Sequence, residues 1–380
     1  MYFDTTSSNT GRLNGACLLI ERDLGVQLLH LACRHHIMEL GNGAVFTACV
    51  GCSSAPEVTL FKRFEAQWRS INQADFDDAL TSDDVMSEII DVKDDVLRFI
   101  EQQLDERQQR DDYREMLILA RGFLGGGVTA PFRYPGPIHH ARWMAKFIYS
   151  FKVWVFRRQF RLTVREESGL RDICVFAVRL YLKAWFTAPL AAAAPNSDLE
   201  LMKALAAYPN RVIGKAAGAK LAKHLWYLSE DLVGLALFDR AVPFATKALM
   251  VSAMDVEADG SEDDRQIPRA QVEFAFVIGK TVADFATANS RRIFERLNLP
   301  SGFLDVAPEE WEDREDFRKA AETVQCQHVV NDHAERGVAL IQKCSGSITH
   351  DEEQLQFLVR VVDDHRRRYP DALKRTVAGQ

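Results

Sequence analysis

Apolar residues change their spacing near residue 57, and this change decides which architecture the chain can adopt. From about 57 to 325 they recur at intervals of three and four, the period of one face of an α-helix. The clearest segments are 84–121, 138–160, 169–187, 198–207, 216–237 and 271–296. Breaks coincide with turn-forming residues, notably Gly125-Gly126-Gly127 and Pro195-Asn196. This region is therefore predicted to be helical almost throughout.

The first 50 or so residues follow another pattern, with two short apolar runs around an amphipathic segment. The first run ends at Asp4, and the second covers residues 28–33. Between them, apolar residues fall at helical spacing: Leu13, Ala16, Cys17, Ile20 and Leu24. Asn9 or Thr10 can cap that helix. The second run is apolar at nearly every position, which predicts a strand buried on both faces of a helix-covered sheet.

Residues 326–369 are predicted to form two more helices. On the first, Val330, Ala334, Val338 and Ile341 make an apolar stripe, and Glu335 lies along its edge. Glu335 is therefore placed to face the edge of a sheet. The predicted fold class is α/β plus all-α, predominantly helical overall.

Composition limits the classes of function. With 47 basic and 54 acidic residues and a net charge of −7, the chain as a whole does not attract phosphate, so nucleic acid would have to bind at local patches. Seven cysteines in a chain that begins without a signal peptide predict reduced thiols in an intracellular protein that is not secreted. No apolar run reaches the roughly 20 residues of a membrane span, which predicts a soluble protein without a membrane partner.

Two short motifs have the residue spacing of a ligand-binding site, and each also has a competing interpretation. Cys33-x-x-His36 with Cys49-x-x-Cys52 suits a tetrahedral structural zinc, but Cys33 and His36 also mark the end of a strand and the start of a helix, so zinc is not expected. Gly279-Lys280-Thr281 resembles the end of a phosphate-binding loop. Phe274 stands where that loop needs its first glycine, so a nucleoside triphosphate is not expected either.

A basic stretch near residue 160 is a candidate for contact with DNA. Arg157, Arg158 and Arg161 lie close to aromatic residues, a combination that suits binding to phosphates and bases. The alternative interpretation is a solvated helix face.

Four short motifs occur in order along the chain: Asp4 followed by Asn9, Cys33-x-x-His36, Arg142-Trp143, and Asn331-x-x-x-Glu335-Arg336. In this order they resemble the second half of a cut-and-paste DNA transposase of the hAT superfamily, and the match covers nearly the whole chain. In that family, a large helical insertion interrupts an RNase H-like core. The resemblance implies a partial core over 1–52, the insertion over 53–325, and C-terminal helices that complete the core over 326–380.

The resemblance also implies a chemistry. RNase H-like nucleases cut phosphodiesters with two divalent ions held by carboxylates from two strands and one helix. Asp4 stands at the position of the second strand carboxylate and Glu335 at that of the helix carboxylate, which implies Mg²⁺ or Mn²⁺. The family motif residues Arg142 and Trp143 would contact DNA as the partner, and Arg336 belongs to the family's final motif. A nuclear location follows from the family alone, and a homo-oligomer is compatible with it.

The chain departs from the family in ways that bear on activity. Asn331 replaces the usual serine, no zinc-finger domain precedes the core, and the first catalytic Asp has no counterpart. Two carboxylates do not complete a two-ion site, so we expect a transposon-derived protein that is inactive as written. The alternative is a host-retained helical scaffold that binds a protein or DNA partner without catalysis.

Overall fold

The structure is a computed structural model that describes residues 1–3, 5–11, 15–51, 58–106, 108, 110–128, 132–135, 144–255, 270, 272–330 and 368. Residues 1–331 form one compact unit, and residues 332–380 are grouped as a second. The predicted boundary between residues 52 and 53 falls inside the first unit. Several predicted site residues lie outside the described residues: Asp4, Cys52, Arg142, Trp143, Glu335 and Arg336. So does the predicted helical region beyond residue 330.

The N-terminal segment folds as a strand, a helical connection, a second strand and a long helix. Its elements are β1 (Tyr2–Phe3), α1 (Ser7–Thr10), α2 (Ala16–Leu24), β2 (Leu31–Ala32) and α3 (Arg34–Val50). The strands pair in parallel, with Tyr2 opposite Leu31 and Phe3 opposite Ala32. A connection through a helix is what parallel pairing requires. Leu31 and Ala32 are buried, so the predicted buried strand over 28–33 is confirmed at these two residues only.

The helix α2 is confirmed, but it packs through a different face from the predicted one. Of the predicted face, Cys17 is buried, but Ile20 and Leu24 are 43% and 57% exposed. Leu18 and Glu21, which lie outside that face, are buried instead. Glu21 belongs to the buried face because its Oε1 accepts a hydrogen bond from the Leu28 amide at 2.7 Å. The buried face of α2 is therefore set by its contact with the chain that returns after the helix, and not by the number of apolar residues on each face.

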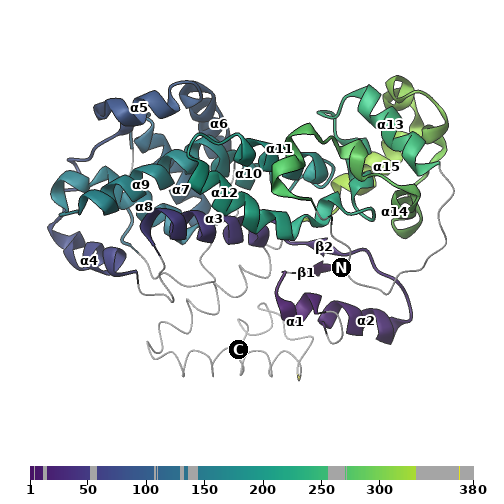
Figure 1. Cartoon of the computed structure of the whole chain (residues 1–380), viewed down its shortest axis with the longest axis horizontal. Helices are drawn as coiled ribbons and strands as arrows, with labels where there is room; N and C mark the ends of the chain where they lie inside the picture. The colour runs from purple at the N-terminus through teal and green to yellow at the C-terminus, as the bar shows by residue number, and fades with distance from the viewer. Residues whose placement is uncertain are drawn as a thin grey trace, which may run out of the picture. The chain divides into compact units, whose positions relative to one another are not determined.

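The helix α3 follows β2 directly and enters the helical region. It packs against α12 (Arg211–Leu221), α9 (Val164–Phe176) and α8 (Ala145–Val155), as Figure 1 shows. Close approach depends on glycine, because a Cβ at Gly169 of α9 would lie 2.7 Å from the Cys49 carbonyl oxygen of α3. A helix from the segment predicted to belong to the core is thus packed among the helices of the predicted insertion.

The helical prediction for the region after residue 57 is confirmed, mostly as shorter helices than expected. Between α3 and the end of α12 the elements are α4 (Thr59–Gln67), η1 (Trp68–Ser70), η2 (Ala79–Thr81), α5 (Asp83–Ile89), α6 (Lys93–Asp105), α7 (Asp111–Phe123), α8, η3 (Arg157–Gln159), α9, the π-helical turn η4 (Ala177–Tyr181), α10 (Leu182–Thr187), α11 (Ala194–Ala206) and α12. The segment 84–121 is divided among α5, α6 and α7. Pro195 lies in the first turn of α11 instead of breaking a helix, because the first turn needs no amide donor.

Short 3₁₀ turns dominate the part that follows α12. Its elements are η5 (Ala222–His224), η6 (Trp226–Leu228), η7 (Val233–Phe238), α13 (Phe244–Met254), η8 (Phe274–Gly279), η9 (Val282–Phe285), η10 (Ala288–Arg291), α14 (Arg292–Arg296), η11 (Gly302–Asp305), η12 (Pro308–Asp313) and α15 (Glu315–Gln325). The spacing predicts a helix over 271–296, and this prediction is largely wrong. Two capping boxes interrupt this segment, one formed by Thr281 with Asp284 and the other by Thr287 with Ser290. Each starts a new helical turn and so ends the preceding one.

The described part of the chain is predominantly helical, with β1 and β2 as its two strands. Residues 326–330 follow α15 without helical structure, although the predicted helix begins there. None of the helices in the described ranges combines the length and the apolar character that a membrane crossing would need.

Candidate functional site

The Cys33-x-x-His36 motif lies where β2 ends and α3 begins. Cys33 is the N-cap residue of α3, and its amide donates to the Phe3 carbonyl oxygen at 2.8 Å. The next amide, that of Arg34, donates to the Val329 carbonyl oxygen at 2.9 Å. The prediction of a strand end and a helix start is confirmed. Three distant segments, β1, α3 and the chain after α15, therefore meet at this motif.

Arg34 is a charged residue in the interior, with 1% of its surface exposed. Its Nε and Nη2 donate to Asp198 Oδ1 at 3.1 and 2.6 Å, and its Nη1 donates to the Ala188 carbonyl oxygen at 2.8 Å. The guanidinium carbon lies 5.9 Å from the Tyr227 ring centroid, and the Tyr227 hydroxyl donates to the Ala32 carbonyl oxygen. These contacts tie α3 to α11 and η6, so losing one partner would leave a buried charge uncompensated.

His35 is buried beside Arg34 and stacks on an indole. Its ring lies 3.8 Å from the Trp185 ring, with 3° between the planes. Its Nε2 is 3.1 Å from the Trp185 carbonyl oxygen, and its Nδ1 is 3.4 Å from the Tyr113 hydroxyl. Both ring nitrogens thus face polar groups of α10 and α7, which makes His35 a packing residue.

Glu39, one turn further along α3, collects three hydrogen bonds. Its Oε1 accepts from the Tyr181 hydroxyl at 2.7 Å, the Met144 amide at 2.8 Å and Asn42 Nδ2 at 3.3 Å. Burial raises the pKa of Glu39, although these hydrogen bonds favour its ionised form. Met144 has a φ of 58°, the left-handed region that a residue with a Cβ rarely adopts. Because Met144 directly follows Arg142-Trp143 in the sequence, this contact links α3 to the chain after that motif.

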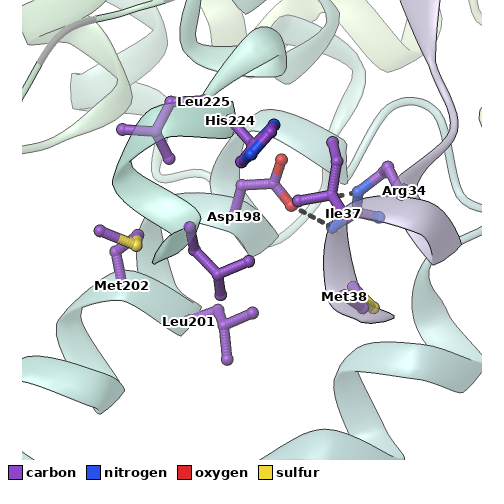
Figure 2. A pocket seen from close by; sticks show the side chains of 9 residues that line it. Arg34, Ile37, Met38, Asp198, Leu201, Met202, His224 and Leu225 are labelled. Carbon is purple, nitrogen blue, oxygen red and sulfur yellow. Dashed lines mark hydrogen bonds and ion pairs between the residues drawn. The ribbon is translucent and has the colours of Figure 1, made fainter. Parts of the chain in front are cut away.

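A small cavity lies beside the Arg34–Asp198 ion pair (Figure 2). Its other lining residues are Ile37, Met38, Leu201, Met202, Leu221, His224 and Leu225. Figure 2 shows the carboxylate oxygen of Asp198 that Arg34 does not use pointing toward His224. The volume is about 20 Å³, which holds one water, whereas ligand pockets typically measure about 300 Å³ or more. The cavity therefore fits a single hydrating water and not a substrate.

The zinc interpretation meets a geometric obstacle. Cys49 follows Cys33 by 16 positions, and both flank or belong to the single helix α3, so they lie about 24 Å apart along its axis. One tetrahedral ion, with ligands at about 2.3 Å, cannot bind both. Burial and the charge of Asp172 raise the pKa of the Cys49 thiol to about 12. Within the described ranges, no group of three or more His, Cys, Asp or Glu could hold a metal.

The predicted basic patch is only partly at the surface. The Arg157 side chain is 10% exposed, lies 3.3 Å from Asp77 Oδ2, and stacks 4.4 Å from the Trp154 ring centroid. Arg158 is 67% exposed and also pairs with Asp77, at 3.0 Å. Arg161 is exposed. Arg157 is therefore engaged within the fold, whereas Arg158 and Arg161 lie at the surface.

The Gly279-Lys280-Thr281 sequence joins two short turns. Gly279 ends η8, Thr281 caps η9, and Lys280 pairs with Asp284 at 3.2 Å. A phosphate-binding loop instead connects a strand to the first turn of a helix. The local structure therefore differs from that of such a loop.

Sequence reasoning selected Cys33 and His36 for a role and passed over the residues with the most elaborate contacts. Arg34 and His35 stand between them in the same motif. Their position at the end of a buried strand was the sequence signal that could have predicted buried polar contacts. The sequence around Asp198 and Glu39 gives no signal of their contacts, because their partners Arg34 and Tyr181 are 164 and 142 positions away.

No protein-family model, no curated protein and no solved structure matches this chain.

Proposed function

We propose that this chain is a transposase-derived protein of the hAT type that binds DNA and does not cut it by itself. The observation that supports this most is the parallel β1–α2–β2 unit, which ends at Cys33 directly before a helix. The motif resemblance predicts this order for the strand with the second Asp and the strand that follows it. In this proposal, residues 1–52 correspond to part of an RNase H-like core.

The proposed DNA contacts come from two regions. Arg142 and Trp143 would act together with the start of α3, and the Met144–Glu39 hydrogen bond is the described contact that supports this. Arg158 and Arg161 supply exposed guanidinium groups that suit phosphates, and an indole such as that of Trp143 can stack on an unpaired base. The substrate class would be DNA with unpaired or branched regions.

The proposal assigns ancestral metal ligands but no cleavage. Asp4 directly follows β1, the place of the strand carboxylate in the resemblance, and Glu335 takes the helix position. Mg²⁺ or Mn²⁺ would need a third carboxylate to be held as a pair over a phosphate. With two carboxylates matched in this sequence, binding without hydrolysis is the expected behaviour.

One observation favours the second candidate, a helical scaffold that binds a protein. Arg34, His35 and Arg157 all direct their polar groups into the fold. Of these, Arg157 was predicted from the basic patch to contact DNA, and such a residue can persist because it stabilises the structure.

The decisive experiment measures both binding and nicking of hairpin and branched DNA by the purified chain, with Mg²⁺ or Mn²⁺ present. We expect binding without nicking, and binding roughly tenfold weaker in Arg142→Ala and Trp143→Ala, because one stacked base contributes about 1–3 kcal/mol. Arg98→Ala, at an exposed pair with Asp95 on α6, serves as the matched control and should bind normally. Equal binding by all variants, or none by the wild type, would favour the scaffold. Nicking that Glu335→Gln abolishes would show that the chain is an active nuclease.

A further inference from the structure

A larger cavity lies where the end of α3 meets the N-terminal parts of α9 and α12. Its volume is about 490 Å³. Small-molecule sites typically measure about 300–1,000 Å³, so this cavity, unlike the one beside Arg34, is large enough for an organic ligand. Among its lining residues Gly169 and Ile213 are buried, whereas the exposed ones include Val164, Arg165, Ser168 and Val212. The cavity therefore has a buried floor and an exposed rim.

Two valines on the rim leave most of their apolar surface in water. Val164, the first residue of α9, is 87% exposed, and Val212, in the first turn of α12, is 68% exposed. Single exposed apolar residues are common on proteins, but these two line the same cavity, and the buried Ile213 lies beside Val212 in the chain. An apolar group bound in the cavity would remove this surface from water.

Arg165 supplies a charge that the fold itself does not use. Among the described residues, no hydrogen bond or ion pair involves its guanidinium. The group lies beside the end of α3, because a Cβ at Gly51 would be 3.5 Å from Arg165 Nη2. Ser168 follows on the same face of α9, and its hydroxyl also has no hydrogen-bond partner within the described ranges. A cation and a hydroxyl are thus both available to a ligand.

The other polar groups of the cavity are engaged within the protein. Asp172 Oδ1 accepts from Arg171 Nε and Nη2 at 3.1 and 2.9 Å, and Asp172 Oδ2 accepts from Asn210 Nδ2 at 3.3 Å. The Asn210 Oδ1 in turn accepts from the Val212 and Ile213 amides at 3.2 and 3.4 Å. The first amides of α12 therefore have a partner already, and the binding capacity of the cavity lies in Arg165 and Ser168.

We propose that this cavity binds a small monocarboxylate with an apolar tail. Arg165 donates two parallel hydrogen bonds to the carboxylate, the Ser168 hydroxyl donates another, and the tail covers Val164 and Val212. Inorganic phosphate fits less well, because it would meet the negative charge of Asp172 and leave the valines uncovered. An amine fits less well because Arg165 would repel it. The site is independent of DNA and of the proposed ancestry.

Three probes of nearly the same shape test the charge that the site selects: phenylbutyrate, phenylbutanol and phenylbutylamine. Each is titrated into the full chain, and the Cδ1 methyl signal of Ile213, assigned by its loss in Ile213→Val, reports binding in this cavity by NMR. We expect phenylbutyrate to bind about tenfold more tightly than phenylbutanol, because hydrogen bonds between charged groups are the stronger ones. Phenylbutylamine should not shift the Ile213 signal.

Three variants test the assigned residues. Arg165→Gln should weaken phenylbutyrate about tenfold and leave phenylbutanol unchanged. Arg161→Gln replaces an exposed arginine that does not line the cavity, and as the matched control it should change neither affinity. Ser168→Trp should fill the rim and weaken both ligands, with folding verified by circular dichroism.

Three results would overturn the proposal. The first is that no probe shifts the Ile213 signal. The second is that phenylbutylamine or inorganic phosphate binds there as tightly as phenylbutyrate does. The third is that Arg165→Gln and Arg161→Gln change the affinity for phenylbutyrate equally, which would mean that the general surface charge, and not this cavity, attracts the carboxylate.

Discussion

At the scale of single residues, the ion pair between Arg34 and Asp198 behaves as part of the core. Every polar contact of the Arg34 side chain described above is to a group of the protein, and the residue is almost sealed from solvent. Such a pair stabilises a fold less through its own attraction than through the penalty of breaking it. The large effect is therefore expected from removal of one partner.

We predict that Arg34→Ala lowers the free energy of unfolding by about 3–5 kcal/mol, because it strands the Asp198 carboxylate in the interior. Urea denaturation followed by circular dichroism measures this change. The control is Lys203→Ala, which removes an exposed pair with Glu200 and should cost about 0–1 kcal/mol. Similar losses in both variants would show that Arg34 is not a core residue.

Glu39 makes stability depend on pH in a predictable direction. Burial raises its pKa in the folded state, so the folded protein binds this proton more tightly than the unfolded chain does. The resulting stabilisation is complete below the unfolded pKa, near 4.5, and is lost as pH rises through the folded pKa.

Glu39→Gln is neutral at every pH and retains an acceptor for the Met144 amide. We therefore predict that the wild type loses stability relative to Glu39→Gln as pH rises from about 4.5 to 7. Denaturation of both proteins across this range gives the difference. If the difference in unfolding free energy between the two proteins stays constant with pH, the pKa of Glu39 is not shifted. If the wild type instead gains stability over Glu39→Gln as pH rises, the pKa of Glu39 is lowered and not raised.

At the scale of elements, the contact of α3 with α9 depends on a glycine that a sequence pattern would treat as a weakness of the helix. A Cβ at Gly169 would meet the backbone of α3 at 2.7 Å, so the two helices would have to separate. By contrast, a Cβ at Gly43 of α3 would meet only Lys146 Nζ, at 3.8 Å.

These two glycines make a matched pair of tests. Gly169→Ala should destabilise the protein by about 1–3 kcal/mol through overpacking. Gly43→Ala should stabilise it by about 0.5–1 kcal/mol, because alanine restricts the unfolded chain and favours the helix. Thermal and urea unfolding of both variants provide the comparison. If both substitutions stabilise, α3 and α9 are not in the close contact described.

At the scale of the whole molecule, α3 joins the N-terminal segment to the helical region. It packs among α8, α9 and α12, and its first turn is held by residues of α11 and η6. Residues 1–331 accordingly group as one compact unit.

We predict that a chain lacking residues 1–51 loses cooperative unfolding, since removing α3 exposes the apolar faces of α9 and α12 and strands Asp198. Calorimetry and binding of a hydrophobic dye would detect this state. Co-expression of residues 1–51 as a separate chain should restore the cooperative transition. If the truncated chain unfolds as sharply as the full one, the helical region is an independent domain, as the sequence predicts.

The sequence by itself determined the local structure of this protein. Periodic apolar residues were enough to predict a helical region, and a continuous apolar run was enough to predict the buried strand before Cys33. The reason is that buried residues recur along the sequence with the period of the helix or strand that contains them. Capping side chains, which act within four residues, explain where the 271–296 prediction failed.

Only the tertiary structure decided which of these elements meet and which polar residues are buried. The buried face of α2, the partners of α3, the Arg34–Asp198 pair and the cavity beside Arg165 all depend on residues far apart in the chain. Whether an arginine or a lysine is solvated or enclosed is set by those distant neighbours, and they leave no periodic signal in the sequence. Local hydrogen bonding therefore determines where the helices and strands form. Long-range packing determines which of their charged residues are buried and which partners they contact.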